Sequence, residues 1–256
     1  MKKRRRFLEL AGMSFLALVG KILQPDPVRA FSLSGVGRVH ARTLKAKRWA
    51  MLIDTLKFND AEKFAVVIRA CHSFHNVPSI AGGQEVKWIW KDTVERVFGE
   101  ETADYKAKGL QAGDCLLSCN HCDNPACVSV CPVGATFRRP DGIVAMDYHR
   151  CIGCRFCMSA CPYGARSFNF SDPRLHIAAL NPDYPARARG IVEKCGFCSE
   201  LLDRGEMPLC VKASDGAIVF GDLADPDSGV SRLLSKRTSI RRNEKLGAGP
   251  GLYYLI

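Results

Sequence analysis

The stretch CNHCDNPACVSVCPVGATFRRPDGIVAMDYHRCIGCRFCMSACPYGARSF, residues 119–168, carries the strongest fold signal of this protein. It holds two copies of one cysteine pattern, and each copy closes on Cys-Pro-x-Gly. The second copy, Cys-x2-Cys-x2-Cys-x3-Cys-Pro, consists of Cys151, Cys154, Cys157, Cys161 and Pro162. The first copy lengthens its second gap to four residues and consists of Cys119, Cys122, Cys127, Cys131 and Pro132. Such an internal repeat predicts two equivalent halves of one module.

This spacing is typical of thiolate ligands to iron-sulfur clusters. Three close cysteines wrap one cubane, while the fourth, placed where a helix is expected to begin, reaches another cluster. Exchange of the fourth cysteines between the copies predicts two 4Fe-4S clusters. One would be held by Cys119, Cys122, Cys127 and Cys161. The other would be held by Cys151, Cys154, Cys157 and Cys131.

Zinc and disulfides are the alternative uses of these cysteines. Zinc binds Cys-x2-Cys pairs, but it takes two such pairs, and a run of three plus a proline-flanked fourth fits it poorly. Disulfides suit an exported protein, yet neighbours in a Cys-x2-Cys-x2-Cys run cannot all pair without strain. The total of 13 cysteines is also odd. Iron-sulfur binding is therefore the preferred interpretation.

The sequence starts with a stretch typical of an export signal. Residues 1–30 have a basic start, an apolar run from Met13 to Gly20 and small residues around Ala30. Arg4 to Leu8 resembles a twin-arginine signal. The apolar run is short for a bilayer crossing, so we expect cleavage near Ala30 rather than a signal that stays as a membrane anchor. This expectation implies a periplasmic protein.

Composition bounds the fold and the partners. With 256 residues and 47% hydrophobic content, the chain can form one or two compact domains. The formal charge of +11 falls to +6 once the expected signal, with seven basic and two acidic residues, is removed. Three thiolate-bound clusters, each contributing about −2, would bring the loaded protein close to neutral. The charge therefore gives no support to nucleic-acid binding.

The rest of the chain shows weaker patterns. An apolar strand is expected at Met51 to Ile53, followed by a helix that runs up to Cys71, and a further strand is expected within residues 142–150. Residues 87–98 look helical, within a segment 82–113 that we interpret as an insertion or a docking surface. Residues 171–190 form a linker. Residues 224–256 are expected to lie along the surface or on a partner.

A third cysteine region follows the linker. Within residues 193–223 stand Cys195, Cys198 and Cys210, and then Ser214 and Asp215 occupy the place where the earlier copies have cysteine and proline. Upstream of residue 115, Cys71 stands alone. The region 193–223 therefore has three cysteines where each of the two earlier copies has four.

The four cysteine regions resemble the four-cluster ferredoxin-like electron-transfer subunits of bacterial membrane oxidoreductases, from about Arg48 to Gly221. That group includes subunits of dimethyl-sulfoxide, polysulfide and formate-dependent nitrite reductase systems. In the family the second motif pairs with the third and the first with the fourth, each lending its last cysteine to its partner's cluster. The implied fold is α+β, with two ferredoxin-like modules, long loops, small two-stranded sheets and short helices.

This resemblance implies a division of the chain and a missing cluster. One module would span 45–81 plus 190–222, the other 114–171, with 82–113 inserted and 223–256 as an extension. The family pattern would place ligands of the first module at Val67, Phe64, Ala61 and Ser214, none of which can bind iron. The remaining set is Cys195, Cys198, Cys210 and Cys71. We therefore predict three 4Fe-4S clusters, with Cys115 as an unliganded core thiol; the alternative is that Cys71 is only structural.

The predicted function follows from these clusters. The chain has no recognisable acid-base or nucleophilic set and no phosphate-binding glycine loop, whereas thiolate-bound clusters move single electrons. The chain is thus predicted to carry electrons and not to be an enzyme itself. The central motifs look most like DsrO-type subunits of the sulfite-reduction-associated complex. This resemblance implies a relay, in dissimilatory sulfur metabolism, between a polytopic quinone-interacting membrane subunit of the NrfD/DsrP type and a multihaem cytochrome c.

Two other functions stay open at this point. The chain could be the electron-transfer subunit of a molybdopterin oxidoreductase of the polysulfide or tetrathionate reductase type, which a catalytic chain in the purified complex would show. It could also be a zinc-stabilised structural protein, which a colourless, EPR-silent preparation would favour.

Overall fold

The computed structural model describes residues 43–58 and 60–256. The predicted twin-arginine signal, residues 1–30, lies outside the described residues. The first half of the described chain contains β1 (Trp49–Asp54), α2 (Ala61–Phe74), β2 (Ile89–Thr93), α3 (Val94–Phe98), α4 (Thr102–Ala107), β3 (Asp114–Ser118), α5 (Ala126–Ser129), β4 (Thr136–Arg138) and β5 (Val144–Met146). The second half contains α6 (Phe156–Ser159), β6 (Ser167–Phe168), β7 (Val192–Glu193), α7 (Ser199–Leu202), α8 (Leu209–Lys212), β8 (Ile218–Asp222), α9 (Gly229–Leu234), β9 (Ser239–Ile240) and β10 (Leu252–Leu255).

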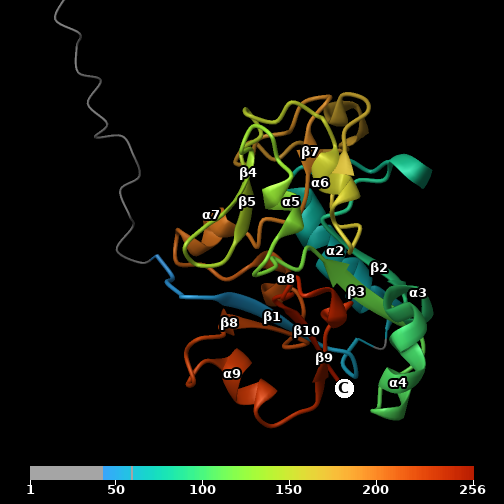
Figure 1. The fold of residues 1–256 in the computed structure, drawn as a ribbon. Helices are drawn as coiled ribbons and strands as arrows, with labels where there is room; N and C mark the ends of the chain where they lie inside the picture. The colour runs from blue at the N-terminus through green and yellow to red at the C-terminus, as the bar shows by residue number, and fades with distance from the viewer. Residues whose placement is uncertain (1–42, 59) are drawn as a thin grey trace, which may run out of the picture. The chain divides into compact units, whose positions relative to one another are not determined.

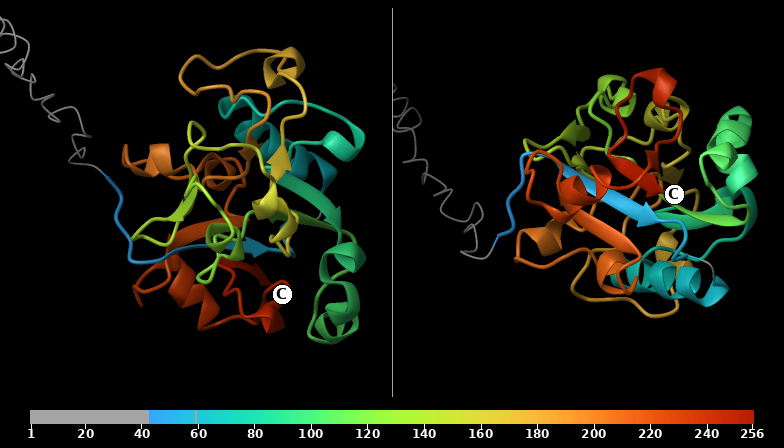
Figure 2. Two further views of the ribbon diagram at one scale, coloured as in Figure 1. Left: turned by 45° about the horizontal axis from the view of Figure 1, so that its top comes forward. Right: turned by 90° about the horizontal axis from the view of Figure 1, so that it is seen from below.

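A four-stranded sheet forms the base of the fold, with strand order β8-β1-β10-β9. Figure 1 shows it below the loops that carry most of the cysteines, and Figure 2 shows β1 running between β8 and β10. All six residues of β1 are buried. Ala50 and Leu52 pack with Val230 of α9, while Met51 and Ile53 face the main core. Because both faces are covered, the residues from Trp49 to Ile53 are all apolar rather than alternating with polar ones.

The C-terminal strand is interior to this sheet. β10 pairs in parallel with β1 and antiparallel with β9. Leu252 and Tyr254 are fully buried, and the Tyr254 hydroxyl donates to the Leu116 carbonyl at 3.1 Å. The expectation that the tail lies on the surface or on a partner is therefore wrong for its last residues. The prediction failed because few apolar residues precede this strand. A short apolar run at the end of a polar segment does not by itself indicate a core strand.

Three two-stranded sheets, β2-β3, β4-β5 and β6-β7, complete the α+β fold. The α+β class predicted from the sequence is confirmed, but the base sheet has four strands and not two. The helix predicted over residues 87–98 is wrong in its first half, because Ile89–Thr93 is a strand and only Val94–Phe98 is helical. Trp88, Trp90 and Phe98 are buried in the main core, so segment 82–113 packs into the fold.

The two cysteine copies fold alike. Each has a four-residue helix, α5 or α6, that ends before the last cysteine rather than beginning at it, which corrects the position expected for the helix. The turn that follows places Gly134 and Gly164 at the same left-handed φ of 61°, which glycine adopts without strain. The helices α5 and α6 contact each other. The internal repeat thus reappears as two similar halves facing one another.

Helix α2 extends three residues beyond Cys71. The Asp60 side chain accepts from the Glu62 N–H at 3.0 Å and caps the helix N-terminus. After the helix, the carbonyls of His75 and Asn76 accept hydrogen bonds from Arg187. Arg187 in turn forms a fully buried ion pair with Glu193, with 2.6 Å between Nη2 and Oε2. The predicted linker is therefore tied to the end of α2 and to β7.

Candidate metal centres

A first group of four cysteines surrounds one cavity of about 340 Å³, lined by Cys119, Cys122, Cys127 and Cys161. Cys119 and Cys122 come from the loop after β3, Cys127 from α5, and Cys161 from the turn after α6. Burial raises the pKa of Cys122 to about 12, and repulsion from the other three cysteines adds to it. The structure thus brings together the four residues predicted to share one cluster.

Polar side chains without partners face this first cavity. Asn120 and Tyr163 both line it. Among the described residues, the Asn120 amide and the Tyr163 hydroxyl are buried with no hydrogen-bond partner. Buried donors of this kind are rarely left unpaired in folded proteins. The sulfur atoms of an iron-sulfur cluster held by the four thiols would supply acceptors, so the residues present fit such a group.

A second group, Cys131, Cys151, Cys154 and Cys157, lines a smaller hollow nearer the surface. Cys154 is exposed, whereas Cys157 is buried. Burial alone would raise the pKa of Cys131, but backbone N–H groups of Thr136, Val133 and Ala135 outweigh it and lower that pKa. The Cys-Pro-x-Gly turn therefore directs N–H donors at the sulfur, an arrangement that stabilises a thiolate ligand.

A third group consists of Cys71 from α2, Cys195 and Cys198 from the loop after β7, and Cys210 from α8. All four are buried. Burial raises the pKa of Cys71 well above its usual value, and repulsion from the other three thiols raises it further. The structure thus places the lone Cys71 beside the incomplete C-terminal motif. A bound metal would resolve this crowding, because coordinated thiols are deprotonated outright.

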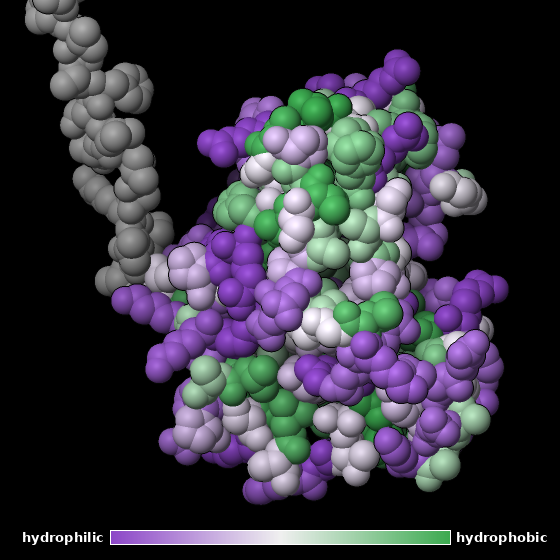
Figure 3. Space-filling model, in the orientation of Figure 1, coloured by the Kyte–Doolittle hydropathy of each residue, from purple (hydrophilic) through white to green (hydrophobic). Residues whose placement is uncertain are grey.

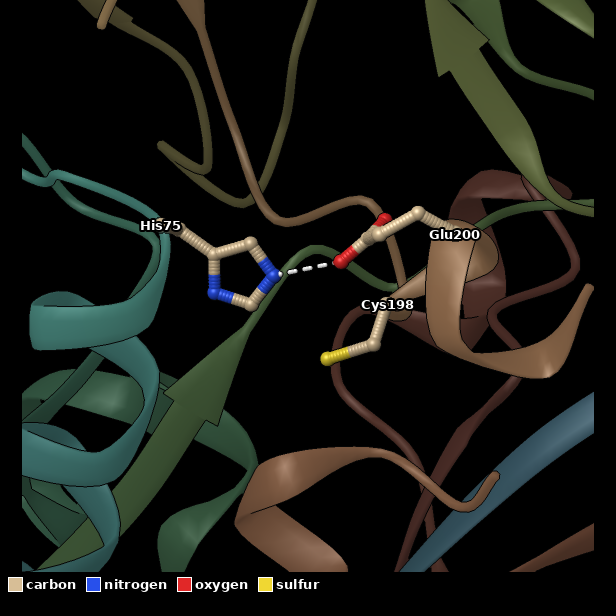
Figure 4. A group of neighbouring side chains, drawn as sticks. All are labelled: His75, Cys198 and Glu200. Carbon is tan, nitrogen blue, oxygen red and sulfur yellow. Dashed lines mark hydrogen bonds and ion pairs between the residues drawn. The ribbon is translucent and has the colours of Figure 1, made fainter. Parts of the chain in front are cut away.

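His75 and Glu200 flank the third group. Figure 4 shows the Cys198 side chain pointing into the space beside the His75–Glu200 pair. His75 Nε2 lies 2.8 Å from Glu200 Oε1, and its Nδ1 lies 2.8 Å from the Cys71 carbonyl oxygen. The ring is fully buried. These contacts orient the imidazole through both nitrogens and place it beside the cysteines.

The positions of the missing ligands hold no thiol. Phe64 and Val67 are core residues of α2, and Ala61 is exposed in the first turn of that helix. The Ser214 hydroxyl donates to the Val211 carbonyl at 2.9 Å and accepts from the Ile218 N–H at 3.0 Å. Apolar packing and a capped turn thus occupy the places where the family pattern would put iron ligands.

Cys115 stands apart from the three groups. It lies on β3, is buried, and lines a separate cavity of about 300 Å³ together with Phe58 and Phe64. Burial raises the pKa of its thiol to about 12. The surroundings are those of a core thiol.

Comparison with known proteins agrees with this arrangement. Residues 116–175 match the 4Fe-4S dicluster domain family. The chain is 36% identical to the Hdr-like menaquinol oxidoreductase iron-sulfur subunit 1 of Archaeoglobus fulgidus, over 99% of this chain and 98% of that protein. It is 35% identical to the iron-sulfur cluster-binding subunit of the menaquinone reductase of Nitratidesulfovibrio vulgaris, over 81% and 88% of the two proteins. It is 39% identical to one of the polysulfide reductase polypeptides of Wolinella succinogenes, over 54% and 63%.

This protein belongs to the ferredoxin-like iron-sulfur electron-transfer subunits of membrane oxidoreductases. As a member of this family it carries electrons for a complex and is not the catalytic component, as the sequence predicted. It binds 4Fe-4S clusters, so the alternative of a zinc-stabilised structural protein is wrong. In the part of the chain that the structure describes, none of the helices has the length and apolar character needed to cross a membrane.

The three groups of this iron-sulfur subunit follow one another in space. Burial raises the pKa of Cys157, and nearby Cys127 adds to the effect, so the second and first groups are neighbours. Burial likewise raises the pKa of Cys195, and Cys119 contributes, so the first and third groups are neighbours. The first group therefore neighbours both of the others.

An aromatic pair fills the junction between the first and third groups. His121, which precedes Cys122, stacks on Phe197, which precedes Cys198, with ring centroids 3.6 Å apart. Both rings are buried, and His121 Nδ1 accepts from the Val144 N–H at 3.0 Å. Burial lowers the pKa of His121 well below its usual value, and Lys194 and Arg48 lower it further. The imidazole is thus held neutral at a contact between the two cysteine loops.

Sequence reasoning missed several polar residues of these centres, namely Asn120, His75, Glu200 and Arg166. The repeat carried one usable signal, because Arg166 stands in the second copy where the first copy has Thr136. A charged residue that replaces a small one at equivalent positions of a repeat marks a site where the halves differ. His75 and Glu200 gave no such signal, because 125 positions separate them in the sequence.

Proposed function

We propose that this protein is a periplasmic electron-transfer subunit that carries three 4Fe-4S clusters. It would relay electrons between a quinone-interacting membrane subunit and a multihaem cytochrome c in dissimilatory sulfur metabolism. One observation carries the cluster count: twelve of the 13 cysteines lie in three groups of four, each composed as the exchange of fourth cysteines requires. The ligand sets are Cys119/Cys122/Cys127/Cys161, Cys131/Cys151/Cys154/Cys157 and Cys71/Cys195/Cys198/Cys210.

The protein's contribution is to hold the three centres in line and to control their exposure to water. A bound 4Fe-4S cluster accepts and releases one electron at a time. The third group is buried in the core, and the second opens to the surface at Cys154. The relay therefore has an exposed end at the second group and an enclosed end at the third. The division into two ferredoxin-like modules, 114–171 and 45–81 plus 190–222, is part of the same proposal.

Apolar side chains surround the exposed end. Ile152 is 64% exposed and Phe156 is 59% exposed, and both flank Cys154 in sequence. Val133 and Phe137, from the other copy, are also exposed. Figure 3 shows hydrophobic residues gathered on the part of the surface that carries β4, β5 and α6 in Figure 1. A contiguous apolar surface of this kind is typical of an interaction site, and we assign it to the membrane partner.

The relatives support a quinone-linked partner. Two of them are named as subunits of menaquinol or menaquinone oxidoreductases, and they align with most of this chain. The cytochrome c partner, the periplasmic location and the sulfur pathway come from the resemblance to DsrO-type subunits and from the twin-arginine pattern at Arg4 to Leu8. A fusion of residues 1–45 to a reporter that is active only after twin-arginine export tests the location. A reporter that stays in the cytoplasm would exclude the periplasmic location.

A second function has its own support. Polypeptides of a polysulfide reductase and of a tetrathionate reductase match about half of this chain, at 39% and 41% identity. In that case a molybdopterin-dependent catalytic component would receive or supply the electrons. Purification of the native complex distinguishes the two functions, because such a catalytic component would co-purify with this protein in place of a multihaem cytochrome.

Metal analysis tests the core of the proposal. The anaerobically purified full chain should contain about twelve iron and about twelve sulfide per polypeptide, and its reduced form should give 4Fe-4S EPR signals. About sixteen iron would mean that a fourth cluster is present after all. About eight would exclude Cys71 and its group as a cluster site.

A further inference from the structure

Arg166 is a buried cation between the first two cysteine groups. Its side chain follows the turn at Gly164, directly before β6, and the residue is 5% exposed. Nη2 donates to Cys127 Sγ at 3.0 Å. Nη1 donates to Thr136 Oγ1 at 3.0 Å and to Met146 Sδ at 3.7 Å. The guanidinium, which belongs to the second copy, is therefore held in one orientation by contacts from the first copy and from β5.

No carboxylate neutralises this charge among the described residues. A buried cation without an acidic partner is costly. The contacts of its guanidinium are Cys127 Sγ, Thr136 Oγ1 and Met146 Sδ. Of these three atoms only the cysteine sulfur can carry a negative charge, so the charge that balances Arg166 comes from the cysteine groups.

The guanidinium serves two groups at once. Cys127 belongs to the first group, and Cys157, at the equivalent position of the repeat, belongs to the second. Arg166 lines the cavity of the first group. Its partners Thr136 and Met146 line the hollow of the second group. One cation thus lies at the boundary of two neighbouring centres.

We propose that Arg166 raises the reduction potentials of the first and second clusters together. This inference rests on the ligand sets of the proposed function. Reduction adds one electron, and hence one negative charge, to a cluster. A fixed guanidinium nearby stabilises that charge, because hydrogen bonds to sulfur and local charge are principal determinants of cluster potential. Arg166 remains protonated throughout, so the step transfers an electron and no proton.

The third group lies outside the reach of these contacts. The described contacts of Arg166 include no member of that group. Its neighbours are different: Lys194 donates to the Val144 and Cys195 carbonyls, and Glu200 pairs with His75. Loss of Arg166 should therefore lower two of the three potentials and leave the remaining one unchanged.

The test is an EPR-monitored redox titration of the anaerobically purified full chain, together with iron and sulfide analysis. Arg166→Gln removes the charge and the two Nη donors and keeps a shorter polar side chain. We expect two midpoint potentials to fall, each by about a tenfold change in the equilibrium constant for reduction, which is about 59 mV for one electron. Arg150→Gln is the matched control, because Arg150 flanks Cys151 but its side chain is largely exposed. Solvent screens that charge, and no shift is expected.

Arg166→Lys covers the case in which Arg166→Gln fails to hold its clusters. Lysine keeps the charge but cannot reach Cys127 and Thr136 with two separate nitrogens. A smaller fall of the same two potentials is expected. Unchanged potentials in a fully loaded Arg166 variant, a shift of one cluster only, or an equal shift of all three would overturn the inference. Wild-type protein with other than about twelve iron would instead overturn the proposed cluster count.

Discussion

At the scale of the residue, Cys71 decides whether the chain carries two clusters or three. It lies on α2, far in sequence from the other members of its group, and its own region contains no second cysteine. The structure nevertheless buries it against Cys195, Cys198 and Cys210. Its assignment as a ligand depends on that long-range contact and can be tested one residue at a time.

Replacement of Cys71 by alanine should remove one cluster. We expect Cys71→Ala to retain about eight iron per polypeptide in place of about twelve, because three thiolates hold a cubane less well than four. Cys115→Ala is the control, since it removes an equally buried thiol that belongs to none of the groups. Iron and sulfide analysis of both variants decides the matter. Full iron content in Cys71→Ala would show that Cys71 is only structural.

At the scale of the element, α2 replaces what the family pattern would make a cluster-binding loop. Ala61, Phe64 and Val67 lie on a regular helix, and Phe64 and Val67 pack in the core. A helix spreads residues three apart along its axis, whereas the first two cysteines of each of the three remaining motifs lie in a loop. On the proposed count of three clusters, hydrophobic packing occupies the place where the family pattern would hold a fourth.

Restoring the four cysteines should not restore the cluster. We expect the variant Ala61→Cys/Phe64→Cys/Val67→Cys/Ser214→Cys to keep about twelve iron. Its thermal midpoint should fall, because large-to-small changes at Phe64 and Val67 each cost on the order of 1–4 kcal/mol. Metal analysis and thermal unfolding under anaerobic conditions provide the readouts. The Ser214→Cys single variant separates the effect of the helix positions, and about sixteen iron in the fourfold variant would contradict this account.

The C-terminal strand β10 offers a second prediction for an element. Tyr254 is fully buried and hydrogen-bonded to the Leu116 carbonyl. Its replacement by alanine should destabilise the fold by roughly 3–5 kcal/mol. Tyr253→Ala, one position along and half-buried on the other face, should cost clearly less. Denaturation of the two variants side by side tests the interior position of β10, and equal losses would argue against it.

At the scale of the whole molecule, the three cysteine groups differ in their access to solvent. The first group neighbours both of the others; the second is exposed at Cys154, and the third is buried. The proposed relay would therefore exchange electrons with a partner at Cys154, where exposed apolar side chains lie nearby.

A charge placed on the apolar surface should weaken docking without disturbing the clusters. We expect Ile152→Glu to slow electron exchange with the quinone-linked membrane partner by about tenfold, because an unpaired carboxylate would be desolvated in the contact. Leu56→Glu, at an exposed position after β1, should have no effect. Stopped-flow oxidation in the reconstituted complex, with iron content as a check on integrity, measures both. Equal rates in the two variants would place the contact elsewhere.

The chemistry of this protein can be read from its sequence without a structure. Spacing such as Cys151, Cys154, Cys157 within one loop is a local property, and local geometry settles which ligand type and cluster class the loop can hold. The strand at Met51 to Ile53, most of the α2 helix and the α+β class also followed from local patterns. The helix placed over residues 87–98 failed, because tertiary pairing of β2 with β3 overrode local preference.

Several contacts between distant residues became known from the folded molecule alone. Folding puts the terminal strand β10 inside the sheet and sets Arg166 beside Cys127. It also places Cys71 beside Cys195, a grouping that the sequence implied only through the family resemblance. It further establishes which groups are neighbours and the exposure of Cys154. These features depend on burial and on contacts between segments far apart in the sequence. Such contacts leave no periodic signal in any one segment.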